Sequence, residues 1–128
     1  MNGTEAYRVE ALLELAAAYP GSLTVREVAR RREIPANFLA RLLGELAHEE
    51  LVVTTRGPRG GVRLAAPPET IGLVQLLRPE PPPDAGGAAV RWLAQRLAEA
   101  QARVLARLKL AALVQVEREQ DTTPSFEI

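Results

Sequence analysis

The sequence feature that most limits the fold is a glycine-rich turn between two short runs of β-forming residues. Residues 51–55 (LVVTT) are rich in β-branched side chains, and residues 56–61 (RGPRGG) hold three glycines and one proline. In residues 62–65 (VRLA), Val62 and Leu64 alternate with other side chains. This pattern predicts a two-stranded hairpin. Two segments with helical patterns come directly before it, so the chain combines one small sheet with helices.

The two segments before the hairpin predict helices joined by a tight turn. Residues 24–27 (TVRE) form a capping box, in which Thr24 and Glu27 satisfy each other's free backbone amides. Pro35 suits the first turn of the next helix, at about residues 36–48, because its missing N–H would be unpaired there. On that helix Leu39, Leu42, Leu43 and Leu46 form an apolar face, and Asn37, Ala40, Arg41, Gly44 and His48 lie on the other side. The pair is typical of a helix-turn-helix.

The tip of the predicted hairpin is basic. Arg56 and Arg59 share one short turn, and turn chemistry explains the glycines there but not the two arginines. Arginine side chains bind phosphate and guanine edges through two hydrogen bonds at once. A helix-turn-helix followed by a basic hairpin predicts a winged helix, in which the second helix enters the major groove and the wing reaches phosphate or the minor groove.

The charge of the chain is zero overall but uneven along the sequence. The chain has 16 basic and 16 acidic residues, which by itself argues mildly against a nucleic-acid partner. Residues 22–63, however, hold eight arginines and five glutamates, a local charge of +3. Two interpretations of the arginine excess stay open. The arginines contact nucleic acid, or a GC-rich or thermophilic genome favours arginine throughout the chain.

A long helical pattern in the C-terminal third predicts pairing with a second copy of the chain. No helix breaker occurs from Ala88 to about Arg118, and a helix of that length would span about 45 Å, more than a small domain needs. The apolar positions step by three or four residues, close to a heptad seam: Val90, Leu93, Leu97, Ala100, Val104, Leu108 and Ala111. We expect this seam to form a homodimer. The alternative is a helix folded back on its own domain.

The predicted fold class is mainly α with a small two-stranded β wing. The predicted regions are a winged helix-turn-helix DNA-binding domain (residues 1–78), a proline- and glycine-rich linker (79–87), a dimerisation helix (88–118) and a disordered tail (119–128). Within the first region, Thr4 is expected to cap the first helix, which ends near residues 19–21 (YPG). Thr70 is expected to cap a short helix that contains the apolar side chains of residues 71–77.

Composition excludes several kinds of site. The sequence has no cysteine and one histidine, His48, which excludes disulfides, thiolate metal sites, a zinc cluster and an ordinary catalytic triad. No acidic pair lies beside a plausible nucleophile in a glycine-lined segment, so an enzyme is disfavoured. No apolar run approaches 18 residues, and the first ten residues lack a signal-peptide pattern. We expect a cytoplasmic protein with no metal, no cofactor and no membrane partner.

Several segments resemble the Rrf-type (Rrf-two) family of bacterial winged-helix transcription regulators, which includes the iron–sulfur cluster regulator and the nitric-oxide-sensitive repressor. The similar segments are residues 7–16 (YRVEALLELA), 24–29 (TVREVA), 34–35 (IP), 38–39 (FL) and 51–61 (LVVTTRGPRGG), together with Ile71, Leu73 and Trp92. The resemblance covers about residues 5–110. The Arg-Gly-Pro-x-Gly-Gly wing after a helix-turn-helix is its most specific part.

The resemblance implies a homodimeric repressor or activator that binds a palindromic operator in double-stranded DNA. It places Asn37, Ala40 and Arg41 at base-facing positions, and Arg56 and Arg59 at wing positions. Some family members have an acidic side chain where this chain has Ala40, so the operator is expected to differ from theirs.

The main departure from the family concerns its sensor. Cluster-binding members carry three cysteines between the short helix and the long helix, and here that segment, residues 79–87, has none. Some members add a ligand from the first helix, and the matching positions here are Ala6 and Glu10. A cluster without thiolates would be very unusual. The sequence therefore predicts a family member without a cluster. The crevice between the short helix and the long helix could instead hold a small molecule or a protein that acts as effector.

Two functions remain open at this point. The first is a sequence-specific DNA-binding transcriptional regulator that acts as a homodimer. The second is a winged-helix protein-interaction module with little affinity for DNA, which the zero net charge favours. The dependence of DNA binding on salt separates them, because binding through phosphate contacts weakens steeply as salt rises.

Overall fold

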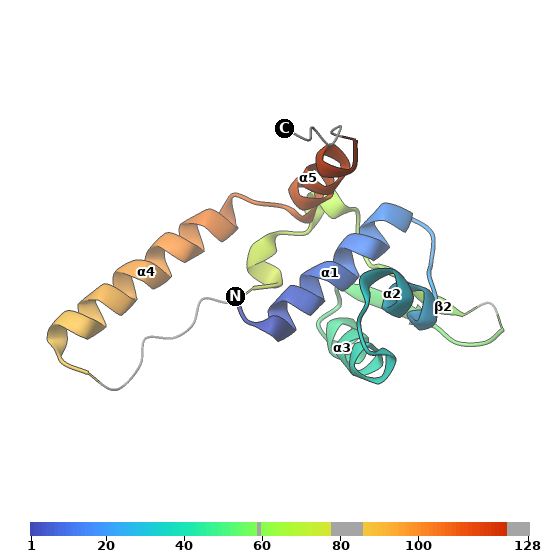
Figure 1. Cartoon of the computed structure of the whole chain (residues 1–128), viewed down its shortest axis with the longest axis horizontal. Coiled ribbons are helices and arrows are strands. Elements are labelled where there is room, and N and C mark those ends of the chain that lie inside the picture. The colour runs from blue at the N-terminus through green and yellow to red at the C-terminus, as the bar shows by residue number, and fades with distance from the viewer. Residues whose placement is uncertain (59, 78–85, 123–128) are drawn as a thin grey trace, which may run out of the picture.

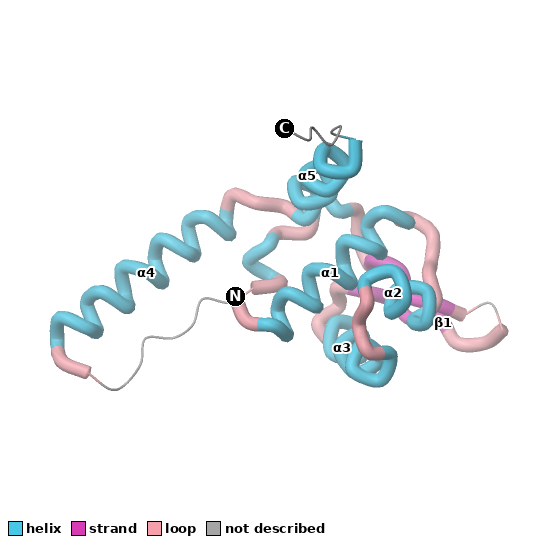
Figure 2. The backbone as a smooth tube through the Cα atoms, viewed as in Figure 1, coloured by secondary structure: helices cyan, strands magenta, loops and turns pink. Residues whose placement is uncertain are grey.

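The computed structural model describes residues 1–58, 60–77 and 86–122 of the 128-residue chain. In chain order it has three helices, a two-stranded antiparallel sheet, two 3₁₀ turns and two further helices. Figure 1 shows α1, α2, α3, the hairpin and α5 gathered in one body, from which α4 extends as an arm. Figure 2 shows how small the strand content is beside the helices. The predicted fold class, mainly α with a two-stranded wing, is confirmed.

The first helix, α1 (Gly3–Ala18), starts earlier than predicted. Its N-cap is Asn2, whose side chain accepts a hydrogen bond from the backbone N–H of Glu5 at 2.8 Å. The Glu5 carboxylate accepts one from the backbone N–H of Asn2 at 3.1 Å, which completes a capping box. Thr4 lies inside the helix, so its assignment as N-cap is wrong. Asparagine caps a helix at least as well as threonine and comes first in the chain.

The helix-turn-helix has the predicted bounds. Thr24 and Glu27 form the predicted capping box, with both hydrogen bonds at 3.1 Å. Helix α2 (Val25–Arg32) ends where Glu33 adopts a left-handed conformation with a φ of 54°, and this turn leads the chain into α3 (Ala36–His48). The four leucines predicted to face the core from α3 are all buried.

The predicted hairpin forms the wing. Strands β1 (Val52–Thr55) and β2 (Gly61–Leu64) pair antiparallel, with Val52 opposite Leu64. Val52, Val62 and Leu64 are buried in the core, whereas the other three residues of β1 are exposed. The wing is therefore anchored at its base, and its turn extends away from the body (Figure 1).

A backbone bridge joins the wing to the start of α2. The N–H of Leu23 donates to the carbonyl oxygen of Val62 at 2.9 Å, and the N–H of Val62 donates to that of Leu23 at 2.7 Å. Only glycine fits beside this bridge at position 61, because a Cβ on Gly61 would lie 2.9 Å from the Leu23 carbonyl oxygen. The bridge fixes the first turn of α2 relative to the wing.

One hydrophobic core holds the body together. Its largest fully buried side chains are Leu12, Leu15, Val28, Leu39, Leu43, Leu46, Leu64 and Leu110. Full burial of a side chain of this size contributes about 1.5–3 kcal/mol. Since Leu110 belongs to this set, α5 is part of the core of the winged helix and not a peripheral tail.

The segment after the hairpin contains two 3₁₀ turns, Pro68–Thr70 and Leu73–Gln75, and not the predicted short helix. Thr70 caps no helix, because its hydroxyl donates back to the carbonyl oxygen of Pro67 at 2.7 Å. Ile71, directly after it, has an extended backbone, which ends the first turn.

Two helices, α4 (Ala88–Ala106) and α5 (Leu110–Thr122), replace the single helix predicted over residues 88–118. Helix α5 also includes residues 119–122, so the prediction of a disordered tail from residue 119 is wrong for these four positions. Residues 123–128 of that tail, and residues 79–85 of the predicted linker, lie outside the described residues. The division into functional regions stays a prediction.

Long-range backbone pairing explains the break between α4 and α5. The N–H of Leu73 donates to the carbonyl oxygen of Leu108 at 2.9 Å, and the N–H of Leu110 donates to that of Ile71 at 2.8 Å. The break therefore uses backbone groups that a continuous helix would have paired internally. It also brings Leu110 into the core, while α4 points away from the body.

Candidate nucleic-acid interface

The outward face of α3 carries the three side chains that were predicted to face bases. Asn37, Ala40 and Arg41 are all exposed, and the leucines on the opposite face of this helix are buried. Gly44, one turn after Ala40, is also exposed, and a Cβ there would meet nothing within 4 Å. This helix face is therefore unobstructed by the described residues, and an exposed α-helix fits the width of the major groove.

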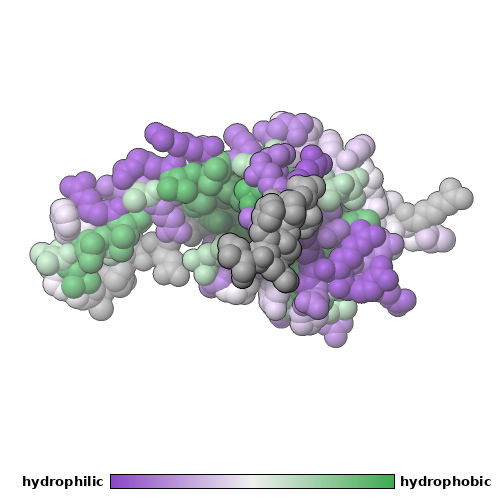
Figure 3. Space-filling model, turned by 45° about the horizontal axis from the view of Figure 1, so that its top comes forward, coloured by the Kyte–Doolittle hydropathy of each residue, from purple (hydrophilic) through white to green (hydrophobic). Residues whose placement is uncertain are grey.

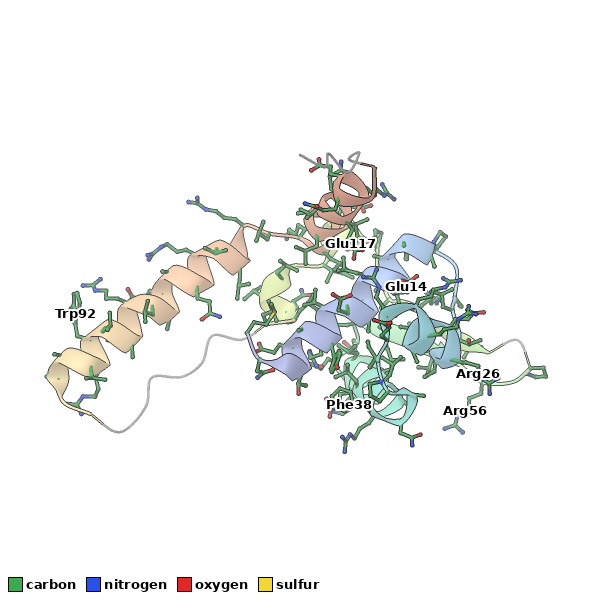
Figure 4. All side chains as sticks on the ribbon, viewed as in Figure 1. Glu14, Arg26, Phe38, Arg56, Trp92 and Glu117 are labelled. Atoms are coloured by element: carbon green, nitrogen blue, oxygen red, sulfur yellow. The ribbon has the colours of Figure 1, made fainter. Side chains whose placement is uncertain are left out.

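The wing arginines are described only in part. Arg56 follows β1 directly and is exposed. Figure 4 shows its side chain extending from the hairpin into solvent. Arg59, the second arginine that was predicted at the wing, lies outside the described residues.

Arg26 was not predicted to contact nucleic acid, but the fold places it on the same side of the molecule as the wing. It is exposed in the first turn of α2. Figure 4 shows both Arg26 and Arg56 on the hairpin side of the molecule. The bridge between Leu23 and Val62 is the cause, since it holds the start of α2 against the base of the wing. The pattern that could have revealed Arg26 is the helix-turn-helix itself, whose first helix crosses the phosphate backbone.

Aromatic rings support Arg41. The guanidinium carbon of Arg41 lies 5.7 Å from the centre of the Phe38 ring, over the ring face. Phe38 is half-buried and makes an edge-to-face contact with Tyr7 of α1, with ring centres 5.6 Å apart and ring planes at 63°. Among the described residues, Arg41 takes part in none of the salt bridges.

An ion pair fixes the start of α1 to the end of α3. Both Nη atoms of Arg8 donate to the carboxylate of Glu49, at 2.8 and 3.0 Å. The side chain of Arg8 is only 12% exposed, so this fork is well shielded from water on one side. Together with the Tyr7–Phe38 contact, it fixes the position of α3 relative to α1.

A second charged cluster, here called the Arg32 hub, joins three helices. Arg32, in the last turn of α2, donates to Glu14 (2.9 Å) and Glu10 (2.8 Å) of α1, and to both carboxylate oxygens of Glu117 of α5 (2.5 and 2.9 Å). The bonds from Arg32 hold the pKa of the Glu117 carboxyl below its ordinary value, and the bond to Glu117 is the largest cause of a raised pKa at Arg32. The hub ties the last helix to the helix-turn-helix.

Helix α4 exposes a row of apolar side chains. The exposed fractions are 52% for Val90, 60% for Trp92, 52% for Leu93, 62% for Leu97 and 57% for Val104. Four of these five residues belong to the predicted seam. Figure 3 shows hydrophobic surface running along the arm toward the body. Among the described residues of α4, only Leu105 is buried, so this helix is not folded back on its own domain.

Comparison with known proteins gives a family match over most of the chain. The model of the Rrf2 family, described as "Iron-dependent Transcriptional regulator", matches residues 2–116. The slr0846 protein of Synechocystis sp. is 42% identical over 72 residues, which are 56% of this chain and 49% of that protein. The HTH-type transcriptional regulator NsrR of Bacillus subtilis is 34% identical over 73 residues, which are 56% of this chain and 50% of NsrR. The matched segment thus spans about half the length of these relatives.

A solved structure shares the fold over nearly the whole chain. IscR from T. potens aligns with a TM-score of 0.79 at 22% identity, covering 98% of this chain and 93% of IscR. At this identity the likeness concerns the fold alone.

Within the described residues, each helix is too short or too polar to cross a membrane.

The residues of this chain do not fit an iron–sulfur cluster. Such clusters are held mainly by cysteine thiolates, and the 128 residues contain none. Glu10, which the resemblance implies matches a ligand position of some family members, accepts a hydrogen bond from Arg32 at 2.8 Å, and Ala6, the other such position, has no donor atom in its side chain. In the described part of the chain, no three histidine, aspartate or glutamate side chains come together as a metal site.

Proposed function

The chain belongs to the Rrf2 family of transcriptional regulators, and we propose that it binds a palindromic operator as a homodimer without an iron–sulfur cluster. The observation that carries this proposal is the unobstructed face of α3, with Asn37 and Arg41 exposed. Asparagine pairs with the N6 and N7 atoms of adenine, and arginine with the O6 and N7 atoms of guanine. The methyl group of Ala40 suits contact with the methyl group of thymine.

The arginines around α3 provide the contacts that do not depend on sequence. Arg26 at the start of α2 is placed to contact phosphate, and Arg56 of the wing to contact phosphate or the minor groove. Arg59 is proposed for the same wing role from the sequence alone. Phosphate contacts position the protein on the duplex, and base contacts provide specificity.

The arm supports the homodimer. Val90, Leu93, Leu97 and Val104 are spaced by three, four and seven residues, which places them along one side of α4. Their own domain leaves them about half or more exposed, although full burial of each would contribute about 1.5–3 kcal/mol. A second copy offers the same face and closes the assembly by twofold symmetry. Two recognition helices related by this symmetry would read a palindrome.

Selection of DNA tests this proposal. The full chain is incubated with a random-sequence duplex library, the bound duplexes are sequenced, and affinity is measured between about 50 and 200 mM salt. We expect enrichment of an inverted repeat and a loss of several orders of magnitude in affinity over that range. No retention of DNA at low salt would contradict the proposal.

A protein-interaction module is the second candidate. The net charge of zero and the exposed Glu45 on α3, one turn after Arg41, favour it. This function predicts almost no DNA binding even at low salt. No catalytic activity is proposed, since the relatives that carry a functional name are transcriptional regulators.

An effector remains part of the proposal. A hollow of about 660 Å³ lies between the start of α1 and the end of α3, and its lining includes Arg8, Arg41, His48 and Leu76. This hollow is a different place from the crevice between the short and long helices that the sequence suggested for an effector. A small molecule or a protein bound there would contact the same Arg41 that is proposed to read bases. Such a ligand would therefore compete with the operator, and a titration of the DNA complex with candidate effectors would detect it.

A further inference from the structure

We propose that Phe38 is a positioning residue for base recognition, because its ring, held by Tyr7, keeps the guanidinium of Arg41 ready to bind guanine. This inference rests on the proposed function and adds to it a residue that sets specificity without itself reading a base. Figure 4 labels Phe38 on α3, and its ring contacts Tyr7 of α1.

The contact between Arg41 and Phe38 takes the place of an ion pair that the spacing on this helix would allow. Glu45 is exposed four residues after Arg41, a spacing at which arginine and glutamate side chains commonly pair. The structure has no salt bridge between these two residues, and the guanidinium lies over the Phe38 ring, 5.7 Å from its centre. Pairing with Glu45 would occupy N–H donors, whereas stacking uses the flat face of the guanidinium and leaves its donors free at the edges.

The ring itself is held in place from α1. Tyr7 contacts Phe38 edge to face at 5.6 Å, and Phe38 is half-buried against the core. The start of α1 is fixed in turn by the fork between Arg8 and Glu49. A long exposed arginine loses conformational freedom when it binds, so holding it beforehand reduces that loss.

The size of the effect follows from the strength of such stacks. A cation–π contact at an exposed site corresponds to roughly a two- to five-fold change in an equilibrium constant. A dimer on two half-sites carries the contact twice, so we expect roughly a four- to 25-fold loss of operator affinity. The loss should fall on the guanine position and not on the other bases.

The test compares Phe38→Leu, Phe38→Tyr and Arg41→Ala in the full chain. The probe is the duplex selected by the wild-type protein, with every base of each half-site varied singly. Arg41→Ala identifies the base pair that Arg41 reads. We expect Phe38→Leu to weaken the preference at that base pair only, Phe38→Tyr to keep it, and Phe38→Leu to have no further effect on it in the Arg41→Ala background.

Each other result has a separate meaning. If Phe38→Leu keeps the guanine preference that Arg41→Ala removes, the positioning role is overturned and the proposed function stands. If Arg41→Ala changes no base preference, both the positioning role and the assignment of α3 as the reading helix are overturned. Equal weakening at all bases by Phe38→Leu would indicate a purely structural role and also overturns the inference.

A measurement without DNA guards against a misfolded variant. In a ¹⁵N-labelled wild-type protein, the ring current of Phe38 should shift the Nε–H proton of Arg41 from its position in an unstacked arginine. The shift should persist in Phe38→Tyr and vanish in Phe38→Leu, with urea unfolding still cooperative in both. An unshifted Arg41 proton in the wild type overturns the proposal whatever the protein binds.

Discussion

Replacing Arg32 by methionine should destabilise the protein by about 2–3 kcal/mol at pH 7. Methionine keeps the apolar stem but removes four hydrogen bonds of 2.5–2.9 Å to Glu10, Glu14 and Glu117. The pair with Glu14 counts most, about 1–2 kcal/mol, because both side chains are only 14% exposed. Glu117 and Glu10 are 36% and 46% exposed, so each of these pairs adds only about 0.2–1 kcal/mol.

The stability lost in Arg32→Met should depend on pH, and the pKa of Glu117 sets the direction of that dependence. The folded protein holds the pKa of Glu117 below its ordinary value of 4.5, so its contribution to stability is present above that value. As the pH falls below 4.5 and through the lowered pKa, the carboxyl becomes protonated in both states and the contribution is lost. The difference between wild type and Arg32→Met should therefore be largest near neutral pH and shrink in acid.

Urea unfolding at pH 7, 5 and 3.5 measures the effect, with protein concentration held fixed because a dimer is more stable at higher concentration. A loss of this size corresponds to a fall in Tm of roughly 10 °C. Arg30→Met on the same helix is the matched control: Arg30 is exposed, forms none of the salt bridges of the described residues, and should cost less than about 0.5 kcal/mol. Equal stability of the two variants, or a gap that stays constant into acid, would refute the reasoning.

Three further predictions concern the interface, the arm and iron. Arg41→Ala should cost about 1–3 kcal/mol in operator binding and relax the preference for one base pair per half-site. Arg56→Ala or Arg59→Ala should instead weaken binding to all sequences evenly and lower the salt slope by about one per lost contact. Identical profiles of the variants in binding titrations would contradict these roles. The double variant Leu93→Asp/Leu97→Asp should be a monomer in light scattering where the wild type is a dimer, and an unchanged mass would argue against pairing through α4. Protein purified without oxygen should be colourless and contain no stoichiometric iron or acid-labile sulfide, and a brown protein would show that a cluster binds without cysteine.

Local patterns determined the part of the fold that carries the proposed interface. The capping box of Thr24 and Glu27 involves residues three apart, so its sequence motif is sufficient to start α2 at the observed position. The leucine spacing of α3 fixed which face is buried, and hence which face presents Asn37 and Arg41. The hairpin was equally predictable, because a glycine-rich turn between β-branched runs leaves few alternatives.

Contacts between residues far apart in sequence decided the features that the patterns missed. Arg26 lies near the base of the wing because of the Leu23–Val62 bridge, and the support of Arg41 includes Tyr7, 34 positions earlier in the chain. Glu117 joins the Arg32 hub across 85 positions. No sequence signal for these contacts exists within a helical turn or a hairpin, because each depends on which faces pack together after the core has formed.

The sequence by itself determined a winged helix with an apolar seam behind it, and only the tertiary structure decided where the seam is interrupted. Residues 107–109 are all compatible with a helix, and propensities among such residues differ by only a few tenths of a kcal/mol each. Two backbone hydrogen bonds to the segment at residues 71–73 and the burial of Leu110 exceed that preference. The chain therefore bends α5 into the core and leaves α4 outside, which is why the apolar side chains of the arm remain exposed.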